Sequence, residues 1–393
     1  MTTMAEGDAD SADESGRPLF VELFLDLVYV FALVSLTKTL TGNLSWTGTA
    51  RTLVLLLAFA LIWTLTTWAG GTSRLARPAV GAHIIGTAAA GLLLAAAAPR
   101  AFDDRGLLFA GTYVFFHLGS ITYFLLVVRD TADPRRTGRL AVWEAVAAVG
   151  WIFGAFTEGP ARLGLWAAAV AVEYGAAALG WPVAGLGRSK SLEWQLGGGR
   201  VPERFRQFVV VAFGAAVLTT GTTFSRQEYT LHRGYALVVV FTIVVLMWRI
   251  YIYRAGELLT EAIARSADPG LLTRTAAVCH LAMVAGIVGV AVTSDLVVVR
   301  PFGETPPSWA AVLLGGPALF LIGRGLLDFT VFGRVSRSRV VGLVLLAGIA
   351  PASSLLPPVL VALLAMLVLA LIAAANLVAT RLHERTPAPP ALG

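Results

Sequence analysis

Repeated apolar segments, each about as long as a bilayer is thick, constrain this chain more than any other feature. A membrane-spanning helix needs about 20 mostly apolar residues, because only a helix satisfies its own backbone hydrogen bonds in hydrocarbon. Twelve segments of this kind follow one another along the sequence. They run over residues 19–37, 51–71, 78–98, 106–128, 139–157, 162–182, 204–224, 234–254, 271–293, 308–328, 336–352 and 356–380. We therefore expect an all-α integral membrane protein with about 12 transmembrane helices.

Composition excludes an ordinary soluble domain. Hydrophobic residues make up 57% of the chain and charged residues 14%, against about 25% charged residues in soluble proteins. The net charge of +6 does not indicate nucleic acid, since the arginines are spread between apolar segments. The expected partner is the lipid bilayer, with a small-molecule or ion substrate. A single cysteine, Cys279, excludes an intramolecular disulfide, and no local metal-ligand spacing appears, so no metal or cofactor is expected.

The loops alternate in positive charge, which predicts orientation. If the N-terminus is cytoplasmic, the inner segments hold 20 Lys and Arg residues and the outer segments eight. This bias places both termini in the cytoplasm of a multi-pass plasma-membrane protein. The acidic start of the chain is the opposite of a signal peptide, so we expect no cleavage.

Composition also suggests a division into two halves. A long inner loop ends in the run Gly197–Gly199 and is typical of a linker. The pattern Glu22-x-Phe24 recurs as Glu203-x-Phe205, which favours a parallel repeat of six helices. The predicted regions are an acidic disordered cytoplasmic tail (1–17), a first six-helix half (18–182), a cytoplasmic linker (183–202), a second, pseudo-symmetric half (203–380) and a disordered cytoplasmic tail (381–393).

Ionisable residues inside apolar segments are costly in lipid, so each needs an explanation. Glu22 and Asp26 lie four apart and share one helix face. They suit a proton-coupled carrier, or alternatively a structural ion pair with Arg249 or Arg324. Arg324 is also spaced to pair with Asp328. The predicted intramembrane site comprises Glu22, Asp26, His83, Arg249, His280 and Arg324.

For the histidines and the remaining acidic residues of the apolar segments, the sequence indicates a functional role less strongly. His83 and His280 suit proton relay or metal binding, with a hydrogen bond to a carbonyl as the simpler interpretation. His117, Glu144 and Glu173 are interpreted as secondary polar contacts between helices.

Four stretches resemble the bacterial low temperature requirement A family. Residues Phe20–Leu33 are similar to its first-helix signature, V-E-L-F-F-D-L-V-F-V, and Glu203–Gly214 to its segment E-R-x-x-x-F-V-I-I-x-L-G. His280 with Gly286-Ile287 resembles H-x-P-L-x-x-G-I, and Gly315–Gly323 resembles G-x-A-L-Y-L-x-G. The resemblance covers about residues 20–330.

The resemblance implies a multi-pass membrane protein linked by name to growth in the cold, without an agreed reaction. It singles out the family-motif residues Glu22, Asp26, Glu203, Arg204 and His280. One position departs from the pattern: the family usually has Glu after the seventh-helix Gly, where this chain has Ala215. If that Glu is required, the activity here is lost or moved.

Three functional hypotheses follow. The first is a secondary-transporter-like carrier, with proton coupling as a further hypothesis. The second is a membrane enzyme or lipid-handling protein at the cytoplasmic interface, although the sequence contains no G-x-S-x-G, H-E-x-x-H or P-loop motif and offers no catalytic residue. The third is a non-catalytic membrane sensor or assembly partner. The sequence leaves the oligomeric state open.

Overall fold

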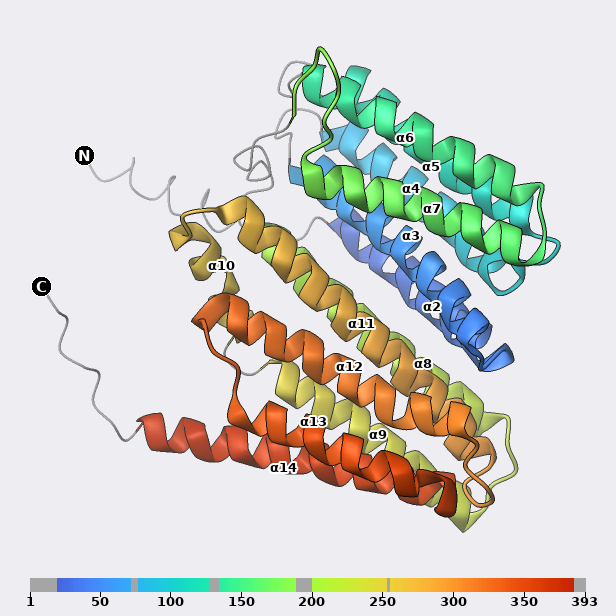
Figure 1. Ribbon diagram of the computed structural model, residues 1–393, viewed down its shortest axis with the longest axis vertical. Helices are drawn as coiled ribbons and strands as arrows, with labels where there is room; N and C mark the ends of the chain where they lie inside the picture. The colour runs from blue at the N-terminus through green and yellow to red at the C-terminus, as the bar shows by residue number, and fades with distance from the viewer. Residues whose placement is uncertain (1–19, 72–76, 127–133, 189–199, 253–254, 385–393) are drawn as a thin grey trace, which may run out of the picture. The chain divides into compact units, whose positions relative to one another are not determined.

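The computed structural model describes residues 20–71, 77–126, 134–188, 200–252 and 255–384. Within these ranges it has thirteen α-helices, α2 to α14, two short 3-10 helices and no sheet (Figure 1). The all-α prediction is confirmed. The predicted tail 1–17 and most of the predicted linker 183–202 lie outside the described residues.

The described residues form two compact units. Unit 1 is assigned the ranges Met1–Val211 and Ile263–Arg274. Unit 2 is assigned the ranges Ala212–Ala262 and Thr275–Gly393. The predicted pseudo-symmetry of two six-helix halves stays a prediction.

Unit 1 is built from six helices and the start of a seventh. They are α2 (Phe20–Gly42), α3 (Trp46–Gly71), α4 (Arg77–Ala97), which continues into the 3-10 turn Ala98–Arg100, α5 (Gly106–Leu126), α6 (Pro134–Ala155), α7 (Gly159–Leu179) and the first part of α8 (Arg200–Ser225).

Unit 2 contains the rest of α8 and the helices that follow it. They are α9 (Leu231–Tyr251), α10 (Ala255–Arg265) and α11 (Pro269–Val299), both shared with unit 1, α12 (Pro307–Phe332), α13 (Arg337–Ile349), a 3-10 turn (Ala350–Leu355) and α14 (Pro358–Glu384). α14 continues into the predicted disordered tail. The short helix α10 falls in a predicted loop and was not expected.

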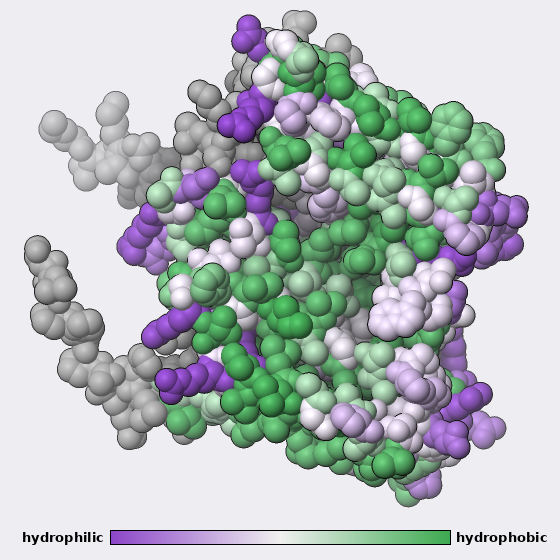
Figure 2. Space-filling model, in the orientation of Figure 1, coloured by the Kyte–Doolittle hydropathy of each residue, from purple (hydrophilic) through white to green (hydrophobic). Residues whose placement is uncertain are grey.

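Ten helices of the described residues are long and apolar enough to cross a membrane. All twelve predicted segments overlap a helix, but α5 and α7 are not among those ten. Figure 2 shows apolar side chains along the helices, with hydrophilic residues mostly near their ends. Large apolar side chains such as Phe115 (75% exposed) and Leu27 (67% exposed) suit contact with lipid.

Small residues bring α6 and α7 together in unit 1. A Cβ atom on Gly154 would lie 2.4 Å from Trp166 Cδ1, and one on Gly150 would lie 3.0 Å from Ala169 Cβ. Without side chains at these two positions the helices approach closely, as is common between membrane helices. α7 ends at Gly180, whose φ of 78° suits a residue without a Cβ. This close packing fixes the inward face of α7.

Candidate functional site

In unit 1, one member of the predicted pair Glu22 and Asp26 forms an ion pair. Arg204 Nη1 of α8 lies 3.1 Å from Asp26 Oδ1 and donates to Gln207 Oε1 at 2.7 Å. Its guanidinium lies over the Trp63 ring, 4.1 Å from the centroid. Glu22 is buried one turn before Asp26 on α2. Asp26 therefore has a partner that is itself a family-motif residue, and the alternative that Arg249 or Arg324 holds the Glu22–Asp26 pair stays a prediction.

Of the predicted site residues in unit 2, Arg324 and His280 have partners within that unit. Arg324 is fully buried and pairs with Asp328, as the spacing predicted, and Arg324 Nε donates to the Ile250 carbonyl at 3.3 Å. Asp328 also contacts Arg339 of α13, which was not foreseen. Arg249 is half-buried on α9. Since unit 1 holds Glu22, Asp26 and His83 and unit 2 the other three, convergence of all six stays a prediction.

The two predicted histidines have different contacts. His83 is half-buried and stacks on Tyr123 of α5, with ring centroids 4.4 Å apart. His280 Nδ1 lies 2.7 Å from the carbonyl of Ala276, one turn earlier, which is the contact that the simpler interpretation expected. Glu203 pairs at 3.5 Å with Arg206 on the same helix, where both side chains are partly exposed.

A different group of ionisable side chains meets inside unit 1. His117 of α5, Glu144 of α6 and Glu173 of α7 are all buried, and one ligand atom from each lies within 4.8 Å of the others. Tyr113, one turn before His117, and Trp151, two turns after Glu144, face the same point. We call these five residues the His–Glu–Glu cluster.

Hydrogen bonds fix one carboxylate of the cluster. Tyr113 donates to Glu173 Oε2 and Trp151 Nε1 donates to Glu173 Oε1, both at 3.1 Å. Trp151 is in turn held because its carbonyl accepts from Trp166 Nε1 at 3.0 Å. The carboxylate of Glu173 is thus oriented by two donors that add no charge.

The histidine is less well satisfied. His117 Nδ1 lies 2.7 Å from Glu144 Oε2, but neither ring nitrogen makes a hydrogen bond of regular geometry. The side chain is 4% exposed, so bulk water does not replace the missing partner. Buried polar atoms are nearly always bonded, and exceptions call for an explanation. In the described part of the chain, no lysine or arginine forms an ion pair with Glu144 or Glu173.

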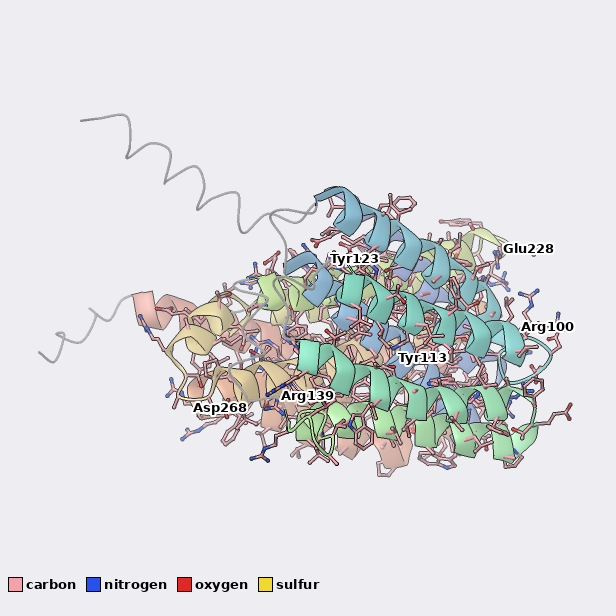
Figure 3. The ribbon with its side chains drawn as sticks, turned by 90° about the horizontal axis from the view of Figure 1, so that it is seen from above. Arg100, Tyr113, Tyr123, Arg139, Glu228 and Asp268 are labelled. Carbon is pink, nitrogen blue, oxygen red and sulfur yellow. The ribbon has the colours of Figure 1, made fainter. Side chains whose placement is uncertain are left out.

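The cluster surrounds a small cavity deep in the helices. The cavity has a volume of about 10 Å³, room for about one water molecule, and all five cluster residues line it. His117 and Glu144 lie about 17 Å and about 15 Å from the starts of their helices, close to half of a bilayer's hydrocarbon thickness. Figure 3 shows Tyr113 part-way along the helices, between Arg139 towards one end and Arg100 at the other.

The spacing of ionisable and aromatic residues along the sequence could have predicted this cluster, whereas the depth of each residue along its own helix could not. Glu144 and Trp151, and likewise Trp166 and Glu173, are seven residues apart and share a helix face. Tyr113 and His117 are four apart. An acid or histidine in register with a large aromatic residue, on three consecutive helices, indicates three polar faces turned to one interior.

Comparisons with known proteins place the chain. The family model described as "Bacterial low temperature requirement A protein (LtrA)" matches residues 18–374. The chain belongs to the LtrA family. A relative, "Uncharacterized protein RA0937" of Rhizobium meliloti (strain 1021), is 31% identical over 308 residues, which are 77% of this chain and 75% of the relative. No solved structure matches the chain.

Membership confirms the family resemblance and a multi-pass membrane protein. Of the LtrA motif residues, Asp26 and Arg204 form one ion pair, whereas Glu203 pairs with Arg206 and His280 contacts the Ala276 carbonyl. Ala215, at the position where the family usually has Glu, is buried on α8.

A second cavity lies in unit 2 and is larger than the cavity of the cluster. It is about 590 Å³ in volume and lies between α12 and α13. Alanine, leucine, glycine and proline line it, with Ser353 and Ser354 as its polar residues. Its size suits a small ligand, but no ionisable side chain lines it, so it offers no acid, base or metal ligand.

Proposed function

We propose that this LtrA protein is a secondary-transporter-like carrier whose transported or coupling ion binds in the His–Glu–Glu cluster. One observation supports the proposal above the others. Three ionisable side chains meet near the middle of α5 and α6 and about two-thirds of the way along α7, around a cavity the size of one ion or water molecule. Ionisable residues at this depth are rare in membrane proteins and typically mark pathways for ions or substrates. Carriers bind their ions near the middle of the bilayer.

Cavity size separates this proposal from the enzyme alternative. A site for an organic substrate usually measures about 300–1,000 Å³, whereas the cluster surrounds about 10 Å³. The larger cavity of unit 2 lacks the groups that chemistry requires. Of these two cavities among the described residues, only the small one is lined by ionisable side chains, and its volume suits a single ion. This favours ion transport over lipid turnover.

Electrical recordings from proteoliposomes test the proposal. Purified protein is reconstituted on a solid-supported membrane, and the solution is switched rapidly to Na⁺, K⁺, Mg²⁺, Mn²⁺ or Zn²⁺. We expect a protein-dependent current with at least one cation. Glu173→Gln keeps the shape and the hydrogen-bond acceptor but removes the charge, so the current should fall at least about tenfold, equivalent to about 1.4 kcal/mol.

The matched control is Glu158→Gln, the same substitution at an exposed residue that precedes α7. Its current should equal that of the wild type. No current with any cation, or equal currents in Glu173→Gln and wild type, would contradict the carrier proposal. Repeating the jumps across a pH gradient with Asp26→Asn tests the separate hypothesis that Asp26 takes part in proton coupling: an unchanged response removes that residue from the mechanism.

A further inference from the structure

We propose that the His–Glu–Glu cluster is a binding site for a divalent transition-metal cation, with His117, Glu144 and Glu173 as its ligands. This inference deepens the proposed function, on which it rests for the ion's passage, although binding itself can be measured separately. It is supported by the donor chemistry, the charge, the space within the cluster and an unsatisfied histidine.

The donor set suits a first-row dication. Imidazole nitrogen and carboxylate oxygen are both ligands of zinc and of related metals such as manganese and iron. Calcium and magnesium prefer ligand sets made only of oxygen. Each carboxylate oxygen of Glu173 accepts one hydrogen bond and keeps a lone pair for a metal.

Distances permit all three side chains to reach one ion. Ligand atoms around a tetrahedral zinc, at about 2.0–2.1 Å from the metal, lie roughly 3.4 Å from one another. The three ligand atoms of the cluster lie within 4.8 Å, and His117 Nδ1 and Glu144 Oε2 are 2.7 Å apart. Small rotations of the side chains convert this arrangement into a coordination shell, and the cavity has room for one ion.

Charge balance favours a dication over a monovalent ion. Two buried carboxylates are costly unless they are paired, because charge is poorly stabilised at low dielectric constant. Within the described residues no lysine or arginine pairs with them, and an imidazolium would offset only one of the two charges. A single dication neutralises both carboxylates, and a neutral His117 then offers a nitrogen to the metal.

The surrounding residues resemble the outer shell of a metal site. Tyr113 and Trp151 hold the Glu173 carboxylate in place, and His117 has a ring nitrogen with no other partner. Outer hydrogen bonds of this kind orient metal ligands, and losing one typically costs 10–100-fold in affinity. Three protein ligands leave a coordination position open, which suits an ion that must enter and leave.

Metal titration of the full chain in detergent tests the inference. The protein carries a purification tag without histidine, Zn²⁺ binding is measured by calorimetry, and Co²⁺ absorption reports the coordination geometry. We expect one Zn²⁺ per chain, and binding at least about 100-fold weaker in Glu173→Gln and His117→Ala. Trp151→Phe should weaken binding about 10–100-fold, whereas Glu158→Gln should bind as the wild type does.

Helix content by circular dichroism and a monodisperse elution profile show that each variant folds. If Zn²⁺ fails to bind the wild type, or binds Glu173→Gln and His117→Ala equally well, the metal inference is wrong. Cation currents that depend on Glu173, without Zn²⁺ binding, would leave the carrier proposal standing and overturn the metal. Zn²⁺ binding without any current would establish a static metal site and overturn the carrier.

Discussion

Replacing Asp328 by alanine is expected to lower the unfolding free energy by about 3–5 kcal/mol, the usual cost of removing one partner of a buried ion pair. Asp328 contacts both Arg324 and Arg339, and all three side chains are buried. Without the carboxylate, two guanidinium groups that shared it repel each other in a medium of low dielectric constant. In thermal unfolding followed by circular dichroism in detergent, the midpoint should fall by about 4–6 °C for a chain of 393 residues.

The chain offers a close control for this prediction. Arg100 and Asp104 form an ion pair with the same i,i+4 spacing, but their side chains are 58% and 55% exposed. Exposed pairs contribute about 0–1 kcal/mol, so Asp104→Ala should shift the midpoint by no more than about 2 °C. Equal shifts in the two variants would mean that water reaches the Asp328 pair, contrary to its burial.

Replacing Gly286 by leucine is expected to prevent α11 and α12 from packing. A Cβ atom at Gly286 would lie 2.6 Å from the backbone nitrogen of Phe320 and 2.7 Å from the carbonyl oxygen of Gly316. Both obstacles are backbone atoms of α12, so the helices must separate to admit even a methyl group. Adding atoms to a packed interior costs about 1–3 kcal/mol and sometimes more, and leucine adds four carbons.

The yield of monodisperse protein after size-exclusion chromatography measures this effect. Gly221→Leu is the matched control, since Gly221 is an exposed residue of α8 with nothing within 4 Å of an added Cβ. Leucine there faces an apolar solvent and gains helix propensity. We expect wild-type yield from Gly221→Leu and little folded protein from Gly286→Leu. Equal yields would show that the contact between α11 and α12 is looser than the structure has it.

The helices could be predicted well because the hydropathy signal in a membrane chain is strong. Each apolar segment must become a helix in lipid, and each predicted segment overlaps one. The eleven-residue helix α10 was missed because it is too short to cross a bilayer and carries charged residues. The predicted segments 106–128 and 162–182 are helices, α5 and α7. Neither is among the ten helices that are long and apolar enough to cross a membrane, so the predicted number of twelve spans is not established.

Local spacing predicted contacts within one helix but not between helices. The pair Arg324–Asp328 was foreseen because residues four apart meet on a helix face. Arg339 was not foreseen as a partner, because it comes from another helix. Asp26 and Arg204 are separated by 178 residues, and only the family resemblance singled out both.

The His–Glu–Glu cluster shows the same limit more clearly. His117, Glu144 and Glu173 were noted individually, but ranking them by depth along single helices made them secondary contacts, and Tyr113 and Trp151 were not singled out. Nothing in one helix states that His117, Glu144 and Glu173 face a common point. That information lies in the packing of α5, α6 and α7, which small residues such as Gly150 and Gly154 permit.

Crystallography at the zinc absorption edge tests the central claim most directly. Crystals of the wild-type protein, grown with Zn²⁺ and without a histidine tag, are measured on both sides of the edge. We predict one strong anomalous peak inside unit 1, at about 2.0–2.2 Å from a His117 nitrogen and from an oxygen of Glu144 and of Glu173. An empty cluster in crystals that hold zinc elsewhere would contradict the account.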